Sequence, residues 1–104
     1  MTAPRRIAFD RVAAAALDRA DIIVHRWLPD GRRDGTEWVC RNPTRADRRV
    51  GSFKINLKTG RWGDFATGDR GGDLVSLAAY LFKLSQADAA RKIADMIGIE
   101  AYET

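Results

Sequence analysis

Residues 52–66 constrain the fold of this chain most strongly, because they carry the pattern of an antiparallel hairpin. In 52–58, SFKINLK, apolar and polar residues alternate, which is the period-two pattern of a strand with one buried face. The Thr-Gly pair at 59–60 allows a tight reversal, and RWGDFA at 61–66 returns as the partner strand. We therefore expect a hairpin with one apolar face and one basic face.

A helical pattern precedes this hairpin. Apolar residues recur at steps of three and four from Phe9 to Leu28, with Asp10 placed to cap the start and Pro29 ending the pattern. The sequence predicts one amphipathic N-terminal helix, with a break allowed near Asp21.

Two further segments lie between this helix and the hairpin. PDGRRDG at 29–35 has the composition of a turn, and TEWVC at 36–40 is a short β-type run. RNPTRADRR at 41–49 lacks periodicity and is interpreted as an exposed loop. The run at 36–40 and the hairpin together predict a three-stranded antiparallel sheet.

Two helices are predicted after the glycine-rich segment 62–74, WGDFATGDRGGDL. Asp73 is placed as the N-cap of the first, and Ser85 with Asp88 resembles a capping box at the start of the second, which Gly98 is placed to end. The predicted fold class is therefore α+β, with an N-terminal helix, a three-stranded sheet and two C-terminal helices. Residues 9–100 are expected to form a single module, between a disordered tail at 1–8 and a short tail at 101–104.

The composition is that of an ordinary globular protein. The chain has 104 residues, of which 45% are hydrophobic and 31% are charged, and this length suits one domain. Its single cysteine, Cys40, excludes an intrachain disulfide and fits a reducing cytoplasm. The longest apolar run, at 12–17, is too short to cross a bilayer, so we expect a cytoplasmic chain with no membrane association.

Positive charge is concentrated in the middle of the chain. Residues 26–61 contain ten Lys and Arg against four Asp and Glu, which gives +6, while the whole chain carries +4. A local excess of cations attracts a phosphate backbone.

These segments also resemble a known family. The order of WVC, GSFKINLKTGRW, GGDLVSLAAYL and QADAARKIADMIGI is similar to that of the zinc-binding domain at the N-terminus of bacterial DnaG-type primases, over roughly residues 20–100. DFATG followed by GGDL also looks like the degenerate primase modules in replication proteins of phages and plasmids, which are mobile elements. The resemblance implies a zinc-ribbon-like fold, a role in DNA replication, contact with single-stranded DNA, and a primase or helicase as protein partner.

The metal ligands of that family are not present here. The family binds one zinc through a Cys-Pro-x-His pair and a Cys-x-x-Cys pair. Cys40 matches the first cysteine, but Pro43 replaces the histidine, and the second pair falls on Asp64 and Thr67. Without a one-residue insertion, that pair falls on Phe65 and Gly68 instead.

One cysteine and one histidine cannot supply four zinc ligands. The histidine, His25, is interpreted as a surface or helix-packing residue. We therefore expect no structural zinc and no cofactor, and we interpret the chain as a metal-free descendant of a zinc ribbon.

Other residues must then stabilise the region that zinc would hold. Asp64 and Thr67 are expected to accept hydrogen bonds from loop amides. The large apolar residues expected to fill the core are Trp38, Trp62 and Phe65, and the glycines expected to reverse the chain are Gly68, Gly71 and Gly72.

The first functional hypothesis is a non-catalytic module that binds nucleic acid, in particular single-stranded DNA. The candidate contacts are Arg41, Arg45, Arg48, Arg49, Lys54, Lys58, Arg61 and Trp62. Trp62 is the candidate for stacking on a base, although a tryptophan in a small hairpin more often belongs to the core.

Two other classes of function remain open. A metal-free adaptor could dock on a helicase or primase, and its binding would respond weakly to salt. An enzyme could hold Mg²⁺ on Asp64, Asp69 and Asp73, but each aspartate also has an ordinary turn or capping role, and no pattern of nucleophile and base accompanies them. We expect no catalysis by this chain alone.

Overall fold

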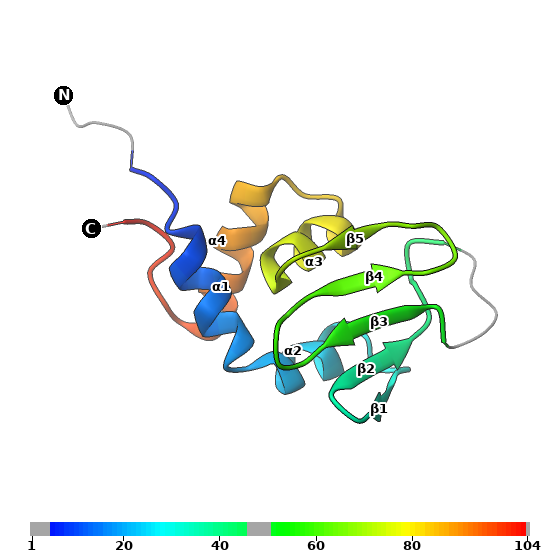
Figure 1. Cartoon of the computed structure of the whole chain (residues 1–104). Helices are drawn as coiled ribbons and strands as arrows, with labels where there is room; N and C mark the ends of the chain where they lie inside the picture. The colour runs from blue at the N-terminus through cyan, green and yellow to red at the C-terminus, as the bar shows by residue number, and fades with distance from the viewer. Residues whose placement is uncertain (1–4, 46–50, 104) are drawn as a thin grey trace.

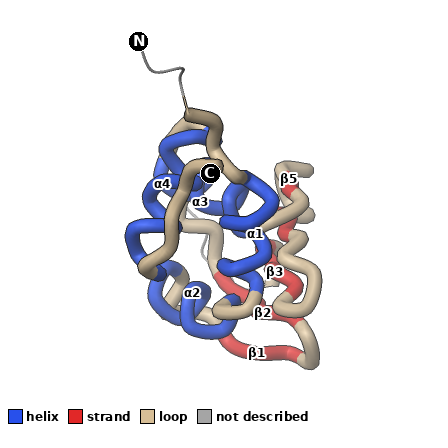
Figure 2. Tube along the Cα trace, turned by 90° about the vertical axis from the view of Figure 1, so that its left-hand side faces the viewer, coloured by secondary structure: helices blue, strands red, loops and turns tan. Residues whose placement is uncertain are grey.

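The computed structural model describes residues 5–45 and 51–103. Its elements are α1 (Phe9–Leu17), α2 (Ala20–Trp27), β1 (Arg32–Asp34), β2 (Glu37–Cys40), β3 (Phe53–Asn56), β4 (Trp62–Asp64), β5 (Arg70–Gly71), α3 (Leu74–Phe82) and α4 (Gln86–Ile97). The helices form one layer that covers one face of the sheet, and the other face is open to solvent (Figures 1 and 2). No helix in these ranges has both the length and the apolar character needed to cross a membrane.

The architecture is α+β, as predicted, but the predicted numbers of helices and strands are wrong. The described residues form four helices and one five-stranded antiparallel sheet with the order β1-β2-β3-β4-β5. The sequence prediction had three helices and three strands. The differences lie in the N-terminal helix and at both edges of the sheet.

The predicted N-terminal helix is two helices. The break that the sequence allowed near Asp21 lies at Asp18 and Arg19. Helix α1 ends in a tighter turn, in which the Arg19 N–H donates to the Ala16 carbonyl at 2.9 Å. No glycine or proline marks this break. It separates α1, which packs on α3 and α4, from α2, whose His25 lies on the Trp38 ring of β2 with the ring centroids 4.3 Å apart.

The two unpredicted strands lack an apolar pattern. All three residues of β1 are exposed, and the strand forms through main-chain pairing with β2. Gly35, with φ of +61°, lies in the short reversal between them. At the opposite edge, β5 contributes only Arg70 and Gly71. A search for alternating hydrophobicity cannot detect strands of this kind.

The predicted hairpin of β3 and β4 is confirmed. Lys54 lies opposite Gly63 and Ile55 lies opposite Trp62. In the intervening turn the Asn56 side chain accepts from the main-chain N–H groups of Lys58 and Thr59. The apolar faces of both strands are buried against the helices.

The core contains two of the three large aromatic residues assigned to it. Trp38 and Trp62 are buried, whereas Phe65 is 79% exposed. The assignment of Phe65 to the core was therefore wrong. Trp62 faces inward from β4, and Phe65, three positions later, falls on the opposite side of the alternation.

The predicted caps of the two C-terminal helices are confirmed. The Asp73 carboxylate accepts from the Ser76 N–H at 2.8 Å, and Ser76 completes a capping box. Ser85 accepts from the Asp88 N–H at 3.0 Å. Gly98 ends α4 with φ of +76°. These local signals set the helix boundaries because each satisfies main-chain groups at a helix end.

The two ends of the chain are hydrogen-bonded to each other. Ile7 forms an antiparallel bridge with Tyr102. The Ala8 N–H donates to the Ala101 carbonyl at 2.8 Å, and the Glu103 N–H donates to the Arg6 carbonyl at 2.7 Å. Parts of the two segments assigned to tails therefore lie side by side.

The glycines of the glycine-rich segment have different roles. Gly68 has φ of +84° and permits the chain reversal expected of it. Gly71 belongs to β5 and does not have a positive φ, so its predicted role in chain reversal was wrong. A Cβ atom on Gly71 would lie 2.4 Å from Ser76 Oγ and 2.5 Å from Trp62 Nε1. The absence of a side chain lets the sheet edge approach the Trp62 indole.

We predict that Gly71→Ala lowers the free energy of unfolding by about 1–3 kcal/mol, because the methyl group would overpack this contact. Gly72→Ala is the matched control, since a Cβ there has open space around it. Urea denaturation of both variants checks the prediction. Equal stability of the two variants would contradict it.

Candidate nucleic-acid interface

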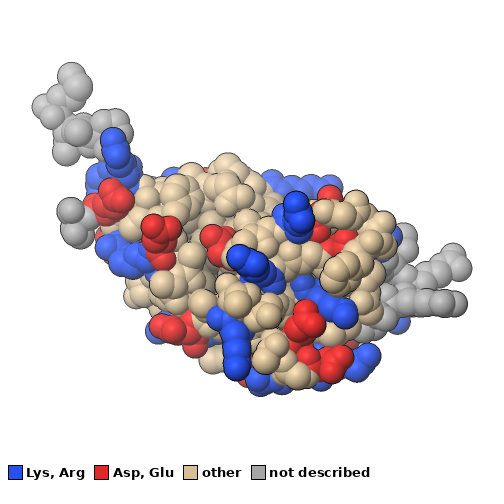
Figure 3. Space-filling view, in the orientation of Figure 1, with Lys and Arg blue, Asp and Glu red and all other residues tan. Residues whose placement is uncertain are grey.

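The open face of the sheet carries three cations in one cross-strand row, with Val39 and Gly63 at the positions between them. The cross-strand pairs place Arg32 opposite Val39, Val39 opposite Lys54, Lys54 opposite Gly63 and Gly63 opposite Arg70. Directly opposed residues share one face of a sheet, and this row spans about 19 Å at about 4.8 Å per strand. Figure 3 views this face and shows Lys and Arg side chains over the sheet, with acidic side chains between them.

Phe65 is the exposed aromatic residue of this face. Lys54 Nζ lies 5.5 Å from the centroid of its ring. A shallow groove of about 370 Å³ lies beside the ring, and its lining includes Lys54, Arg61, Gly63, Phe65 and Arg70. Gly63, which has no side chain, lies between Lys54 and Arg70 in this lining. We call the open face of the sheet the outer face; its functional candidates are Arg32, Lys54, Arg61, Phe65 and Arg70.

Phe65 was assigned to the core, although the sequence carries the signal that places it on the opposite face from Trp62. Since Trp62 and Asp64 point inward, the alternation of a strand directs residues 61, 63 and 65 outward. Applying the period of the strand through residue 65 would have separated the roles of Trp62 and Phe65.

The hairpin residues predicted to bind nucleic acid do not all lie on the outer face. Lys54 and Arg61 lie there, and Lys58 is exposed in the turn between β3 and β4. Trp62 is only 6% exposed, and its indole N–H donates to Ser76 Oγ at 3.0 Å. Its ring is part of the core and does not provide a stacking surface, so Phe65 replaces it as the candidate.

The predicted arginines after β2 are placed differently. Arg41 is exposed directly after the strand. Arg48 and Arg49 lie outside the described residues. Arg45 Nε donates to Asp64 Oδ2 at 3.0 Å, and its side chain is 35% exposed. The Arg45 guanidinium is thus held by a carboxylate within the domain.

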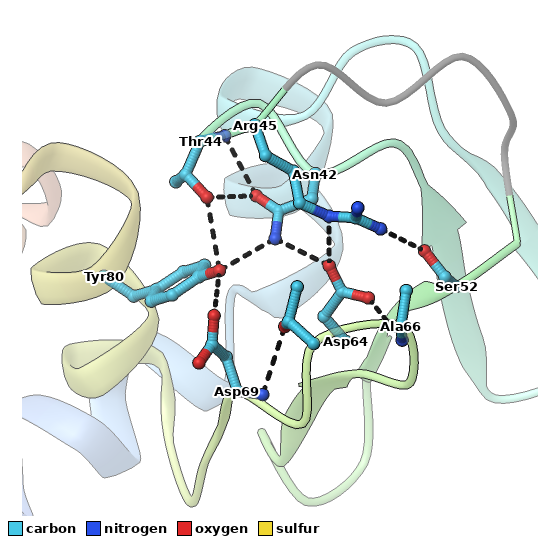
Figure 4. Close-up of polar contacts among 9 residues, drawn as sticks. Asn42, Thr44, Arg45, Ser52, Asp64, Ala66, Asp69 and Tyr80 are labelled. Carbon is cyan, nitrogen blue, oxygen red and sulfur yellow. Dashed lines mark hydrogen bonds and ion pairs between the residues drawn. The ribbon is translucent and has the colours of Figure 1, made fainter.

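This ion pair belongs to a polar cluster built around two buried side chains (Figure 4). Asn42 and Asp64 are 1% and 2% exposed, and Asn42 Nδ2 donates to Asp64 Oδ2 and to the Tyr80 hydroxyl, both at 2.8 Å. The Tyr80 hydroxyl donates to Asp69 Oδ2 at 2.7 Å. We call the group the Asp64 cluster, and its members are Asn42, Thr44, Arg45, Asp64, Asp69 and Tyr80.

The turn after β4 uses the side-chain hydrogen bonds expected of it. Asp64 Oδ1 accepts from the Ala66 N–H at 2.9 Å, and Thr67 Oγ1 accepts from the Asp69 N–H at 3.2 Å. Both predicted roles are confirmed. They fix the turn that carries Asp69 toward Tyr80.

Comparison with known proteins identifies the fold. No family model matches the chain, and no curated protein matches its sequence. A solved structure does match: the crystal structure of the Aquifex aeolicus primase, comprising its zinc-binding and RNA polymerase domains, with a TM-score of 0.71 and 20% identity. The fold is similar to that of a primase zinc-binding domain. The match covers 92% of this chain and 22% of the primase chain, and at this identity the likeness concerns the fold alone.

The residues of this chain do not fit the zinc ion of a primase zinc-binding domain. Of the four positions matched to ligands in the sequence, only Cys40 offers a thiol. Pro43 has no ligand atom in its side chain, Asp64 is engaged by Arg45 and Asn42, and the Thr67 hydroxyl accepts from the Asp69 N–H. Phe65 and Gly68, the positions matched without an insertion, have no ligand atom in their side chains. Over the described part of the chain, no group of three Cys, His, Asp or Glu side chains is arranged to hold a metal ion.

The environment of Asp64 favours its ionised form. Burial alone raises the pKa of this carboxyl. The hydrogen bonds from Asn42, from the Ala66 N–H and from Arg45, together with the positive charge of Arg45, outweigh burial and lower the pKa below its ordinary value of 3.8.

We predict that Asp64 makes the fold sensitive to acid. Because its pKa is lower in the folded chain than in the unfolded chain, the ionised carboxylate stabilises the fold above about pH 4. This contribution is lost as the pH falls through the folded-state pKa. Asp64→Asn should lower the free energy of unfolding at pH 7 by about 2 kcal/mol and should flatten its decline below about pH 4.

Urea denaturation at a series of pH values from neutral to acidic tests this expectation. Asp95→Asn is the control, because it removes an exposed carboxylate from α4. If the free energy of unfolding falls in acid by the same amount in the wild type and in Asp64→Asn, the assignment is refuted.

Proposed function

We propose that the chain is a non-catalytic module that binds single-stranded nucleic acid, in particular single-stranded DNA. We place it in a DNA replication system, where it would work beside a primase or helicase. The observation that carries this proposal is the exposed Phe65 ring on a basic sheet face, beside Lys54, Arg61 and Arg70. The similarity to a primase zinc-binding domain supports the setting in replication.

The chemistry of the outer face suits a single strand. An exposed aromatic ring can stack on an unpaired base, which contributes about 1–3 kcal/mol per base and tolerates any sequence. In a duplex the bases already stack on one another, and the ring would meet only their edges. The cations beside Phe65 are spaced across the sheet, so they can neutralise successive phosphates of an extended strand.

The three aspartates weighed as a magnesium site have other partners. Asp64 is paired with Arg45, Asp69 accepts from Tyr80 and Asp73 caps α3. We therefore propose no catalytic role for them, and the module would contribute binding alone.

A second candidate function is docking on a protein partner. A groove of about 490 Å³ lies where α2 and α3 end beside α4, and its lining includes Trp27, Phe82 and Met96. The Trp27 and Phe82 rings meet edge to face with their centroids 5.4 Å apart, and Phe82 is 40% exposed. Exposed aromatic residues of this kind are frequent in protein interfaces.

We predict that Phe65→Ala weakens binding of a fluorescein-labelled single-stranded oligonucleotide about tenfold, because it removes the stacking surface. Fluorescence anisotropy at low salt measures the effect. Phe82→Ala removes an exposed aromatic from the helix layer and should leave the affinity unchanged. Equal affinities for the wild type and Phe65→Ala would reject the outer face as the stacking site.

We predict that the affinity for a single strand falls with salt in proportion to the number of phosphates that the outer face neutralises. With four cations, Arg32, Lys54, Arg61 and Arg70, the slope of log affinity against log salt should be about −3 at about −0.7 per phosphate. Lys54→Ala and Arg70→Ala should each make it less steep by about 0.7, while Lys92→Ala on α4 should not change it. Arg45 is avoided because its loss would also disturb the Asp64 cluster.

Absence of binding at low salt would reject the nucleic-acid function for this chain. The docking function would be favoured instead if a protein partner bound the chain with an affinity that changed little with salt, and if Phe82→Ala abolished that binding.

A further inference from the structure

The Asp64 cluster joins the two loops that carry the positions matched to zinc ligands. One loop follows β2 and contains Asn42 and Arg45. The other follows β4, which ends at Asp64. The hydrogen bonds from Asn42 Nδ2 and Arg45 Nε to Asp64 Oδ2, at 2.8 and 3.0 Å, cross from the first loop to the second.

We propose that the Asp64 cluster is a metal-independent link that holds these two loops together, in the place where a related domain would use a bound metal. The link also reaches a third element, because the Tyr80 hydroxyl of α3 accepts from Asn42 and donates to Asp69. The inference concerns the fold and does not depend on nucleic-acid binding.

The hydrogen bonding of the cluster is complete enough for this role. Asp64 accepts from Asn42 and Arg45 on one oxygen and from the Ala66 N–H on the other. The Asn42 carbonyl oxygen accepts from the main-chain N–H and the hydroxyl of Thr44, at 2.9 and 2.6 Å. In residues 5–45 and 51–103 no buried side-chain nitrogen or oxygen atom lacks a partner. A fully satisfied buried network rigidifies the segments that it joins.

The charge of the cluster disfavours a metal ion. The Arg45 guanidinium supplies the positive charge that balances Asp64, with Nε 3.0 Å from Oδ2. A divalent cation bound to the same carboxylate would therefore be repelled by a neighbouring like charge. A zinc link fails when a chelator removes the metal. The Asp64 link instead requires an ionised carboxylate, so it should resist chelators and fail in acid.

The first test uses the wild-type protein. Its metal content and its urea denaturation with and without EDTA should show substoichiometric zinc and no change in the denaturation midpoint. Stoichiometric zinc in the purified protein, or a midpoint lowered by EDTA, would overturn the proposal.

The second test separates a local link from a general contribution to stability. Tyr80→Phe removes the hydroxyl from the cluster and keeps the ring, which packs on Trp62 with the centroids 4.7 Å apart. Native-state hydrogen exchange should show the Thr44 and Ala66 amides exchanging about fivefold to tenfold faster, while amides of α1 are unchanged. Tyr102→Phe, at the opposite end of the molecule, is the control.

Unchanged exchange at Thr44 and Ala66 in Tyr80→Phe, or an equal increase throughout the chain, would overturn the proposal. If Tyr80→Phe does not fold, Thr44→Ala removes a half-buried hydroxyl from the same network, and the same two outcomes decide the question.

Discussion

The register of β3 against β4 is the constraint on which both faces of the sheet depend. With Lys54 opposite Gly63, Phe53, Ile55, Trp62 and Asp64 all point toward the helices, and Lys54, Arg61 and Phe65 point toward solvent. A shift by one residue would exchange the two sets. It would bury the cations and expose Trp62, so the same pairing determines the core, the Asp64 cluster and the outer face.

The sequence predicted the parts of the fold that depend on local chemistry. The caps at Asp73 and Ser85 and the hairpin of β3 and β4 were recognisable because each satisfies main-chain groups within a few residues. Strands β1 and β5 were not, since their residues are polar and their pairing partners decide their conformation. The break between α1 and α2 depends on which surface each helix covers, and no residue type marks it.

The sequence predicted which kinds of residue form the candidate site better than it predicted where each side chain lies. The basic character of the hairpin was evident, but the roles of Arg45, Trp62 and Phe65 depend on tertiary contacts. Arg45 is paired with a carboxylate 19 positions away along the chain, and its charge therefore serves the domain itself. The alternation within β4 determines which of Trp62 and Phe65 is buried and which is exposed. Shifting this alternation by one residue would reverse the two assignments.

A metal ion and a hydrogen-bonded cluster can join the same two loops with different physical dependences. A metal adds a strong, directional connection that requires an external ion. The Asp64 cluster is built entirely from side chains of the chain, and its stability follows the ionisation of one buried carboxylate. The fold is similar to that of a primase zinc-binding domain, and in this chain the two loops meet through hydrogen bonds and an ion pair.

The pairing of Ile7 with Tyr102 has a consequence for tethering. The described end segments, 5–8 and 101–103, lie side by side at the end of the molecule remote from the sheet (Figure 1). A polypeptide joined beyond these segments would therefore be attached on that side. The attachment points of an immobilisation tag or a fused neighbour would lie away from Phe65 and the cations around it.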